Sequence, residues 1–174
     1  MQVSCRFPRT LASFLLVAAA LAGPALATEQ WQHSSEQDAM RGTQTHFAEL
    51  YSTTRLAGSG GQPVALTILV RRAEAKKSDE VLLAIVNAQF SCAHSDCYAL
   101  VKFGAQAPKK YALSRSTDMS NIILFVERAA DFLGQLRRSP TVIIEVDVLR
   151  GGRQQFAFEV PPLKLPDRPT RASK

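Results

Sequence analysis

From Pro63 onward, apolar and polar side chains alternate with a period of two, in short runs separated by polar or glycine-containing breaks. Runs of this kind, rich in Val, Ile, Phe and Tyr, are typical of half-buried antiparallel strands. The pattern predicts strands over residues 64–71, 81–90, 97–103, 110–114, 121–126, 141–149 and 154–160, and an earlier one over 45–52. We therefore expect a mainly β fold, an antiparallel β-sandwich-like sheet of about seven or eight strands.

Residues 127–138 depart from the period of two. Their apolar side chains recur at i, i+3, i+4 and i+7, the spacing of one helix face: Ala129, Phe132, Leu133 and Leu136. Two arginines follow at the carboxyl end, where they suit the helix dipole, and Pro140 prevents the helix from continuing. We expect one short α-helix over 127–138 that covers a face of the sheet.

The first residues have the pattern of a secretory signal peptide. Two arginines precede an apolar run over residues 11–21, and residues 25–27 supply a small-x-small cleavage pattern. A retained membrane helix is the alternative, but a Gly-Pro pair breaks the run before it reaches the length of a bilayer crossing. We expect residues 1–27 to be removed between Ala27 and Thr28, which leaves a periplasmic chain without a transmembrane segment.

Composition indicates one domain after the leader. The chain has 174 residues, of which 46% are hydrophobic and 21% charged, enough for one core. We expect a single β-rich domain over 28–160 and a disordered tail over 161–174, which is rich in proline and basic residues. Without the leader, 19 basic side chains stand against 15 acidic ones, a net charge of +4. This charge is scattered and small, so we expect no nucleic-acid partner.

Two cysteines remain after removal of the leader, in the string Ser-Cys-Ala-His-Ser-Asp-Cys. An even pair in an exported chain predicts a disulfide between Cys92 and Cys97. The same segment includes four side chains that can bind a metal, but alternating residues of one tight loop rarely converge on a tetrahedral ion. We therefore expect a disulfide, no metal and no cofactor.

The cysteines also predict a strand pairing. If they face each other, the strand over 81–90 pairs with the strand over 97–103. Three apolar pairs then share one face: Val86 with Phe103, Ala88 with Val101 and Phe90 with Ala99.

A second hairpin turns near Gly151. A three-residue loop over 151–153 sets Val148 beside Phe156 and keeps the apolar stripe, whereas a two-residue Gly-Gly turn sets Val148 against Gln155. We expect the longer loop, which also places Glu145 opposite Glu159.

The sequence contains no recognisable catalytic motif. It lacks G-x-S-x-G and S-x-x-K, and none of its three histidines lies in a known catalytic frame. The glycine-rich stretch over 58–61 lacks the Gly-Lys-Ser/Thr ending of a phosphate-binding loop. Glu145 and Glu159 resemble a carboxylate pair, but both face solvent in an open hairpin, which does not separate their pKa values. We expect no catalytic residues and no enzyme activity.

Polar side chains gather on the less apolar face of the disulfide hairpin. Next to a rigid loop, such a patch is a candidate recognition surface. The candidate residues are Asn87, Gln89, His94, Asp96, Tyr98 and Lys102.

A series of packing residues runs in order through residues 31–163. It comprises Trp31 with Asp38-Ala39-Met40, Gln89-Phe90-x-Cys92, Cys97 before Val101-Lys102-Phe103, Ser116-x-Asp118, the short helix and Phe156-x-Phe158-x-Val160. This order resembles a group of small uncharacterised exported proteins of Gram-negative bacteria with no assigned activity, and more remotely it is similar to periplasmic accessory proteins associated with type VI secretion. The chain departs from the pattern at Lys164-Leu165, where an aromatic residue is expected. The resemblance implies a periplasmic location and a β-rich fold.

Two hypotheses of function follow. The first is a non-enzymatic periplasmic binding or accessory module that engages another envelope protein, through an edge strand or the polar face around residues 92–102. The second, motivated by location and positive charge, is an envelope hydrolase or an inhibitor of a cell-wall-active enzyme. We favour the first, because no catalytic constellation is visible.

Overall fold

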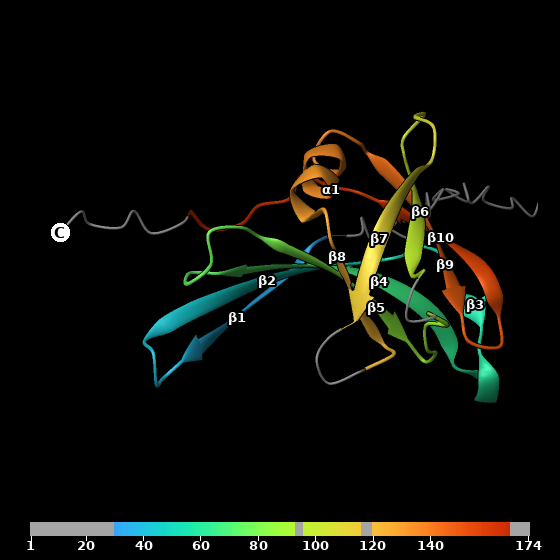
Figure 1. The fold of residues 1–174 in the computed structure, drawn as a ribbon, viewed down its shortest axis with the longest axis horizontal. Helices are drawn as coiled ribbons and strands as arrows, with labels where there is room; N and C mark the ends of the chain where they lie inside the picture. The colour runs from blue at the N-terminus through green and yellow to red at the C-terminus, as the bar shows by residue number, and fades with distance from the viewer. Residues whose placement is uncertain (1–29, 93–95, 116–119, 168–174) are drawn as a thin grey trace, which may run out of the picture.

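The computed structural model describes residues 30–92, 96–115 and 120–167. These residues form one antiparallel sheet of ten strands in the order β1-β2-β4-β5-β8-β7-β6-β9-β10, with β3 beside β4 (Figure 1). The strands are β1 (Gln32–Asp38), β2 (Thr43–Tyr51), β3 (Leu56–Ala57), β4 (Pro63–Ala73), β5 (Glu80–Val86), β6 (Tyr98–Phe103), β7 (Lys109–Arg115), β8 (Ile123–Val126), β9 (Thr141–Val148) and β10 (Gly152–Glu159). The mainly β, sandwich-like fold is confirmed, with more strands than expected.

The two unexpected strands are β1 and β3. β1 reads Gln-His-Ser-Ser-Glu-Gln-Asp, and its side chains are exposed on both faces except for the half-buried Asp38. A strand without a buried face has no hydrophobic period of two, so the pattern of apolar residues does not reveal it. β3 has only two residues and is too short to show a period.

The sheet bends until its two halves enclose one core. β1, β2, β4 and β5 run across the view in Figure 1, whereas β6, β7, β9 and β10 run steeply across them. Both halves contribute to the core, for example Ile68 from β4 and Ile144 from β9. At one end the halves meet, because the Thr53 N–H donates to the Ala157 carbonyl oxygen of β10 (2.8 Å).

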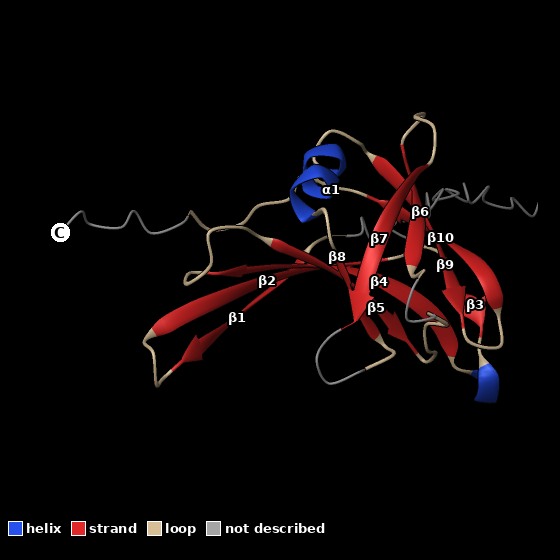
Figure 2. Ribbon diagram, viewed as in Figure 1, coloured by secondary structure: helices blue, strands red, loops and turns tan. Residues whose placement is uncertain are grey.

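Helix α1 (Ala129–Leu136) lies within the expected segment and is two residues shorter at each end. Its apolar stripe is buried. The Phe132 ring meets the rings of Phe103 and Tyr111 edge-on, with centroids 5.3 and 5.4 Å apart. The helix therefore covers the core beside β6 and β7, as its periodicity predicted (Figure 2).

A carboxylate fixes the first turn of α1 to β7. Asp131 Oδ2 accepts hydrogen bonds from the Lys109 ammonium and the Tyr111 hydroxyl, both at 2.7 Å. The bond from Lys109, followed by that from Tyr111, holds the pKa of Asp131 below its usual range. Burial, together with Asp131, raises the pKa of Tyr111. The phenol therefore stays protonated and remains a hydrogen-bond donor to the carboxylate.

The expected pairing of the strands over 81–90 and 97–103 is wrong. β5 pairs with β4 and β8, whereas β6 pairs with β7 and β9. β5 ends at Val86 because Asn87 has a φ of 58°, in the left-handed region, which turns the chain out of the strand. The two strands instead supply side chains to the common core from opposite halves of the sheet, Ile85 from β5 and Val101 from β6.

The loop of the second hairpin has three residues as expected, but it comprises residues 149–151 rather than 151–153. A shift by an even number of positions leaves the apolar stripe on the core face, so the hydrophobic pattern does not choose between these registers. Glu145 therefore faces Gln155, and the expected like-charge pair with Glu159 is not formed.

Residues 161–167, the first part of the expected tail, contact the domain. This segment has no regular secondary structure, but Trp31 Nε1 donates to the Pro161 carbonyl oxygen (2.9 Å) and Arg72 Nη1 donates to that of Pro166 (2.6 Å). Two leucines of the segment pack against the core. The prolines of this segment have no N–H with which to pair as a strand. The side chains of Trp31 and Arg72 hold the segment instead.

Two expectations concern segments outside the described residues, namely the signal peptide over 1–27 and the tail over 168–174. Within the ranges that the structure describes, no helix combines the length and the apolar character that a bilayer crossing requires.

Candidate functional site

The fold divides the five described members of the six predicted surface residues between two places. Asn87 and Gln89 follow β5 and lie beside the loop after β9. Tyr98 and Lys102 alternate with buried residues along β6 and so lie on the outer face of that strand. Asp96 precedes β6 and bonds to the same face, whereas His94 lies outside the described residues. The five described residues therefore do not form one patch, because the strands over 81–90 and 97–103 do not pair with each other as a hairpin.

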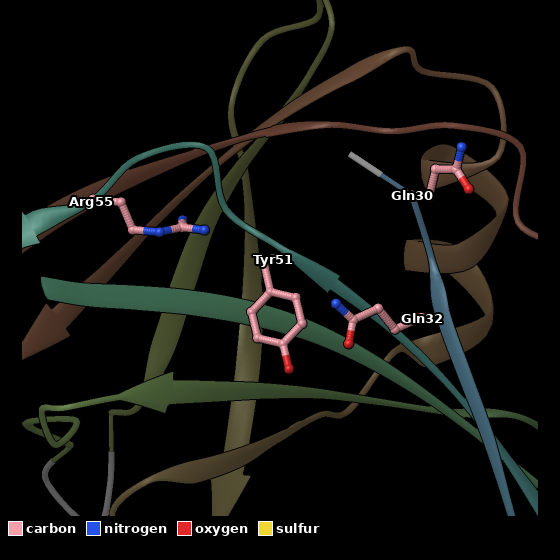
Figure 3. A pocket seen from close by; sticks show the side chains of 4 residues that line it. All are labelled: Gln30, Gln32, Tyr51 and Arg55. Atoms are coloured by element: carbon pink, nitrogen blue, oxygen red, sulfur yellow. The ribbon is translucent and has the colours of Figure 1, made fainter. Parts of the chain in front are cut away.

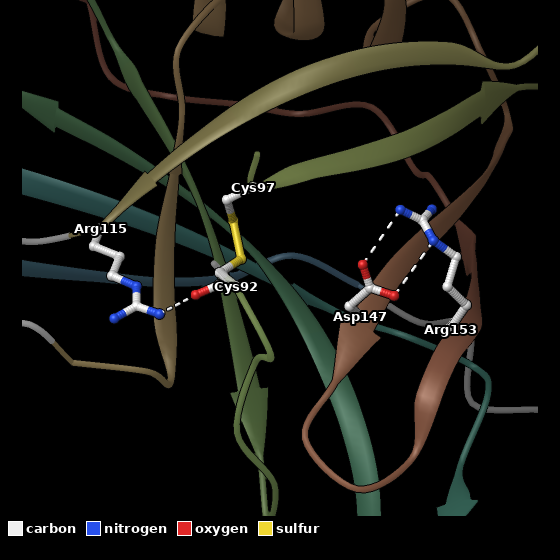
Figure 4. Close-up of a disulfide and its surroundings, with 5 residues drawn as sticks. All are labelled: Cys92, Cys97, Arg115, Asp147 and Arg153. Carbon is white, nitrogen blue, oxygen red and sulfur yellow. Dashed lines mark hydrogen bonds and ion pairs between the residues drawn. A yellow bond between two sulfur atoms is a disulfide. The ribbon is translucent and has the colours of Figure 1, made fainter. Parts of the chain in front are cut away.

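The predicted disulfide joins Cys92 and Cys97, whose Cα atoms are 5.0 Å apart (Figure 4). Residues 89–91 lie along the end of β9, where the Ser91 N–H donates to the Asp147 carbonyl oxygen (2.8 Å). β6 pairs with β9 further along, from Leu100 onward. Residues 89–91 and β6 thus both pair with β9, and the disulfide closes the connection between these two stretches.

Replacing both Cys92 and Cys97 with serine is expected to lower the free energy of unfolding by about 2 kcal/mol, because the closed loop restricts the unfolded chain. The loss stays near this value because Arg115 also keeps Cys92 in place, by donating a hydrogen bond to the Cys92 carbonyl oxygen. Urea unfolding of both proteins measures the difference. Wild-type protein under reducing conditions is the control and should match the variant. Equal midpoints with and without the bond would contradict the prediction.

The outer face of β6 carries a network of charged side chains around Tyr98. The Tyr98 ring lies between two cations, with Lys110 Nζ 3.7 Å and Arg153 Cζ 4.4 Å from its centroid. Lys110 also pairs with Asp96 at 3.2 Å, and Arg153 pairs with Glu145 at 2.9 Å. These side chains bind one another, so the network stabilises the sheet and offers few free donors or acceptors to a ligand.

A hollow of about 580 Å³ lies where three connecting segments meet at the end of the sheet. We call it the end hollow; it is lined by Ile85, Asn87, Ala88, Gln89, Ile122, Leu149 and Arg150. Ile122 is 46% exposed and Leu149 is 47% exposed. The end hollow thus combines accessible apolar side chains with two amides and one cation.

Backbone hydrogen bonds hold the walls of the end hollow together. The Ile85 N–H donates to the Ile122 carbonyl oxygen (2.9 Å), and the Leu149 N–H donates to that of Gln89 (2.8 Å). Among the described residues, the only non-glycine residues with positive φ are Asn87 and Arg150, and both line this hollow. Such conformations persist only where the surrounding structure enforces them, and they are frequent at functional sites.

A second, polar hollow of about 320 Å³ lies beside the start of β1 (Figure 3). We call it the β1 hollow; it is lined by Gln30, Gln32, Tyr51 and Arg55. The Tyr51 hydroxyl donates to Glu49 at 2.9 Å, and this bond raises the pKa of Tyr51. Arg55 Nη1 makes long bonds, to Ser52 Oγ at 3.4 Å and to the Thr54 carbonyl oxygen at 3.2 Å.

The residues considered for catalysis and metal binding are not brought together. Glu145 accepts bonds from Gln155 and Arg153, which lower its pKa, and Glu159 lies at the other end of β10. In the described part of the chain, no three His, Cys, Asp or Glu side chains are placed to hold a metal ion. The carboxylate pair of Glu145 and Glu159 is therefore not formed.

The sequence did not single out Ile122, Leu149 or Arg150, which line the end hollow. Leu149 was expected to continue a strand, and its exposure follows from the earlier position of the loop after β9. Within an alternating run, the sequence does not show that a particular apolar residue is exposed. The exposure of Leu149 is therefore revealed only by the register of the hairpin.

Comparison of the chain with protein-family models, curated proteins and solved structures finds no match. Function is therefore inferred from the geometry of the chain itself.

Proposed function

We propose that the protein is a non-enzymatic binding module of the bacterial envelope that engages a partner protein at the end hollow. The observation that carries the proposal is the clustering of exposed apolar side chains. Of the five large apolar side chains that are exposed among the described residues, Ile122 and Leu149 line the end hollow, and Val86 lies next to it in the chain.

The chemistry of the end hollow favours a protein as the partner. Protein interfaces combine an apolar centre with a rim that donates and accepts hydrogen bonds. Here Ile122 and Leu149 supply exposed apolar surface, and Asn87 and Gln89 of the same lining supply amides. Arg150 adds the only charge of the lining. We propose a partner segment that inserts an apolar side chain next to a carboxylate.

An envelope location supports this function. The N-terminal sequence has the pattern of an exported chain, and a disulfide persists in an oxidising compartment such as the periplasm. A periplasmic location is also what the resemblance to small exported proteins implies.

The experiment compares a double variant, Ile122→Asp with Leu149→Asp, with the control Ile143→Asp. Ile143 is also exposed but lies on β9, away from the lining of the end hollow. Each tagged protein is cross-linked in the envelope of its host, and the captured proteins are quantified by mass spectrometry. We expect one envelope protein to fall at least about tenfold with the double variant, because central contacts dominate binding, and to stay at wild-type level with the control.

Direct binding completes the test. The envelope protein identified in this way is purified, and its affinity for wild type and both variants is measured by calorimetry, with melting curves to confirm that each variant is folded. Identical captured sets for the double variant and wild type would overturn the assignment of the end hollow, as would unchanged affinity.

A further inference from the structure

The outer edge of β1 is open. β1 ends the strand order, and β2 is the only described strand that pairs with it, in continuous register over all seven residues. Native proteins usually blunt an edge with charged side chains, especially lysine, with proline or with a bulge. β1 contains no lysine and no proline, and its charged side chains are Glu36 and Asp38. Its unpaired N–H and C=O groups are therefore ready to accept another strand.

The turn after β1 displays an apolar side chain. Met40 is 94% exposed, the highest value among the exposed large apolar residues that the structure describes. Asp38 Oδ1 accepts hydrogen bonds from the backbone N–H of Met40 (3.0 Å) and of Arg41 (3.1 Å). These bonds hold the turn in one conformation, so Met40 is presented at a defined place rather than on a loose loop.

The β1 hollow lies at the opposite end of the same strand. Gln30 and Gln32 line it from the start of β1, and Arg55 lines it from the segment before β3 (Figure 3). One strand therefore has an apolar tip at its carboxyl end and a hollow at its amino end. An antiparallel neighbour with the same sequence would place its tip at this hollow.

We propose that β1 pairs antiparallel with β1 of a second copy of the chain, about a two-fold axis at Ser35. This register uses all seven residues. The facing pairs are Gln32 with Asp38, His33 with Gln37, Ser34 with Glu36, and Ser35 with itself. Each carboxylate faces an amide or a hydroxyl, which can donate to it.

Two symmetric registers shifted towards the carboxyl end of β1 are less favourable. An axis at Glu36 sets two glutamates against each other, and an axis at Gln37 sets Glu36 against Asp38. Both arrangements also leave part of the strand unpaired. The axis at Ser35, the midpoint of β1, avoids both costs.

The Asp38 end of β1 in one copy then lies beside the Gln32 end in the other, so the turn that carries Met40 comes close to the β1 hollow. The two-fold axis repeats this contact at the other end. The open edge of β1 is thus covered in a closed isologous dimer, with the exposed methionine next to the hollow.

Cysteine cross-linking tests the register. Only Ser35 faces its own counterpart, so Ser35→Cys should form a covalent dimer on mild oxidation, whereas Gln37→Cys alone should not. A mixture of His33→Cys chains with Gln37→Cys chains should form a mixed dimer. Equal cross-linking of Ser35→Cys and Gln37→Cys would overturn the proposed axis.

Association is measured by sedimentation velocity of the purified protein. We expect a dimer at about 100 µM, in the range of weak specific association, and about tenfold weaker association for Met40→Asp, because the tip would bring an unpaired charge into the contact. The matched control Ile143→Asp changes another exposed apolar side chain, on β9 and far from β1 in the strand order, and should associate like wild type. A chain that stays monomeric up to about 100 µM overturns the proposed dimer. It leaves the proposed binding of a partner at the end hollow unaffected.

Discussion

Replacing Phe132 with alanine is expected to lower the free energy of unfolding by about 3–5 kcal/mol, the largest effect of any substitution considered. Phe132 is fully buried. Its ring packs edge-on against Phe103 and Tyr111. The alanine variant leaves a cavity between α1 and the sheet that the rigid strands cannot fill. Urea unfolding followed by circular dichroism measures the loss.

Phe132→Leu provides the matched control. Leucine retains most of the buried apolar volume and should therefore cost clearly less than alanine. If alanine and leucine destabilise the protein equally, the helix does not pack on the sheet as described. A loss below about 1 kcal/mol for alanine would contradict a fully buried ring.

Replacing Asp79 with alanine is expected to lower the free energy of unfolding by about 3 kcal/mol, because it leaves a poorly hydrated guanidinium without its carboxylate. Arg72 and Asp79 form a two-bond pair, with Nε to Oδ1 at 2.8 Å and Nη2 to Oδ2 at 2.7 Å. Their side chains are only 14% and 11% exposed. Asp79 raises the pKa of Arg72, so the guanidinium stays charged.

The double variant Arg72→Met with Asp79→Leu separates the stability contributed by the ion pair from the cost of leaving one charge unpaired. Because it removes both charges, it should be more stable than Asp79→Ala alone. It also removes the donor to Pro166, so trypsin should cleave after Lys164 faster than in wild type. Fully additive losses in a double-mutant cycle would show that the two side chains do not interact.

The two proposed surfaces lie at different ends of the molecule and can act together. In Figure 1, the β1–β2 hairpin extends to the left, and the loop after β9 lies at the lower right. A dimer formed through β1 therefore carries two copies of the end hollow. Such a dimer would bind a partner with two sites more tightly than either hollow does alone.

The sequence by itself predicted most of the elements and the disulfide. Most of strands β4 to β10, and helix α1, follow from the period of two or of 3.6, because burial of one face leaves that period in the sequence. β4 and β5 are buried on both faces over part of their length and show a continuous apolar run there. The link between Cys92 and Cys97 follows from an even count of cysteines in an exported chain. These features depend on residues close together in the chain.

The candidate sites depended on strand pairing. Asn87 and Gln89 were found by their polarity, but their neighbours Ile122 and Leu149 come from segments distant in sequence, so no local pattern could associate them. β1 was missed because a strand exposed on both faces has no apolar period.

Local periodicity therefore determined which residues form strands, which form the helix and which face the core. Only the tertiary structure decided that β5 and β6 belong to opposite halves of the sheet, where the loop after β9 begins, and which edge stays open. The physical reason is that burial repeats along the chain and is recorded in each segment, whereas backbone pairing is chemically the same for every strand and is settled only when all segments pack together.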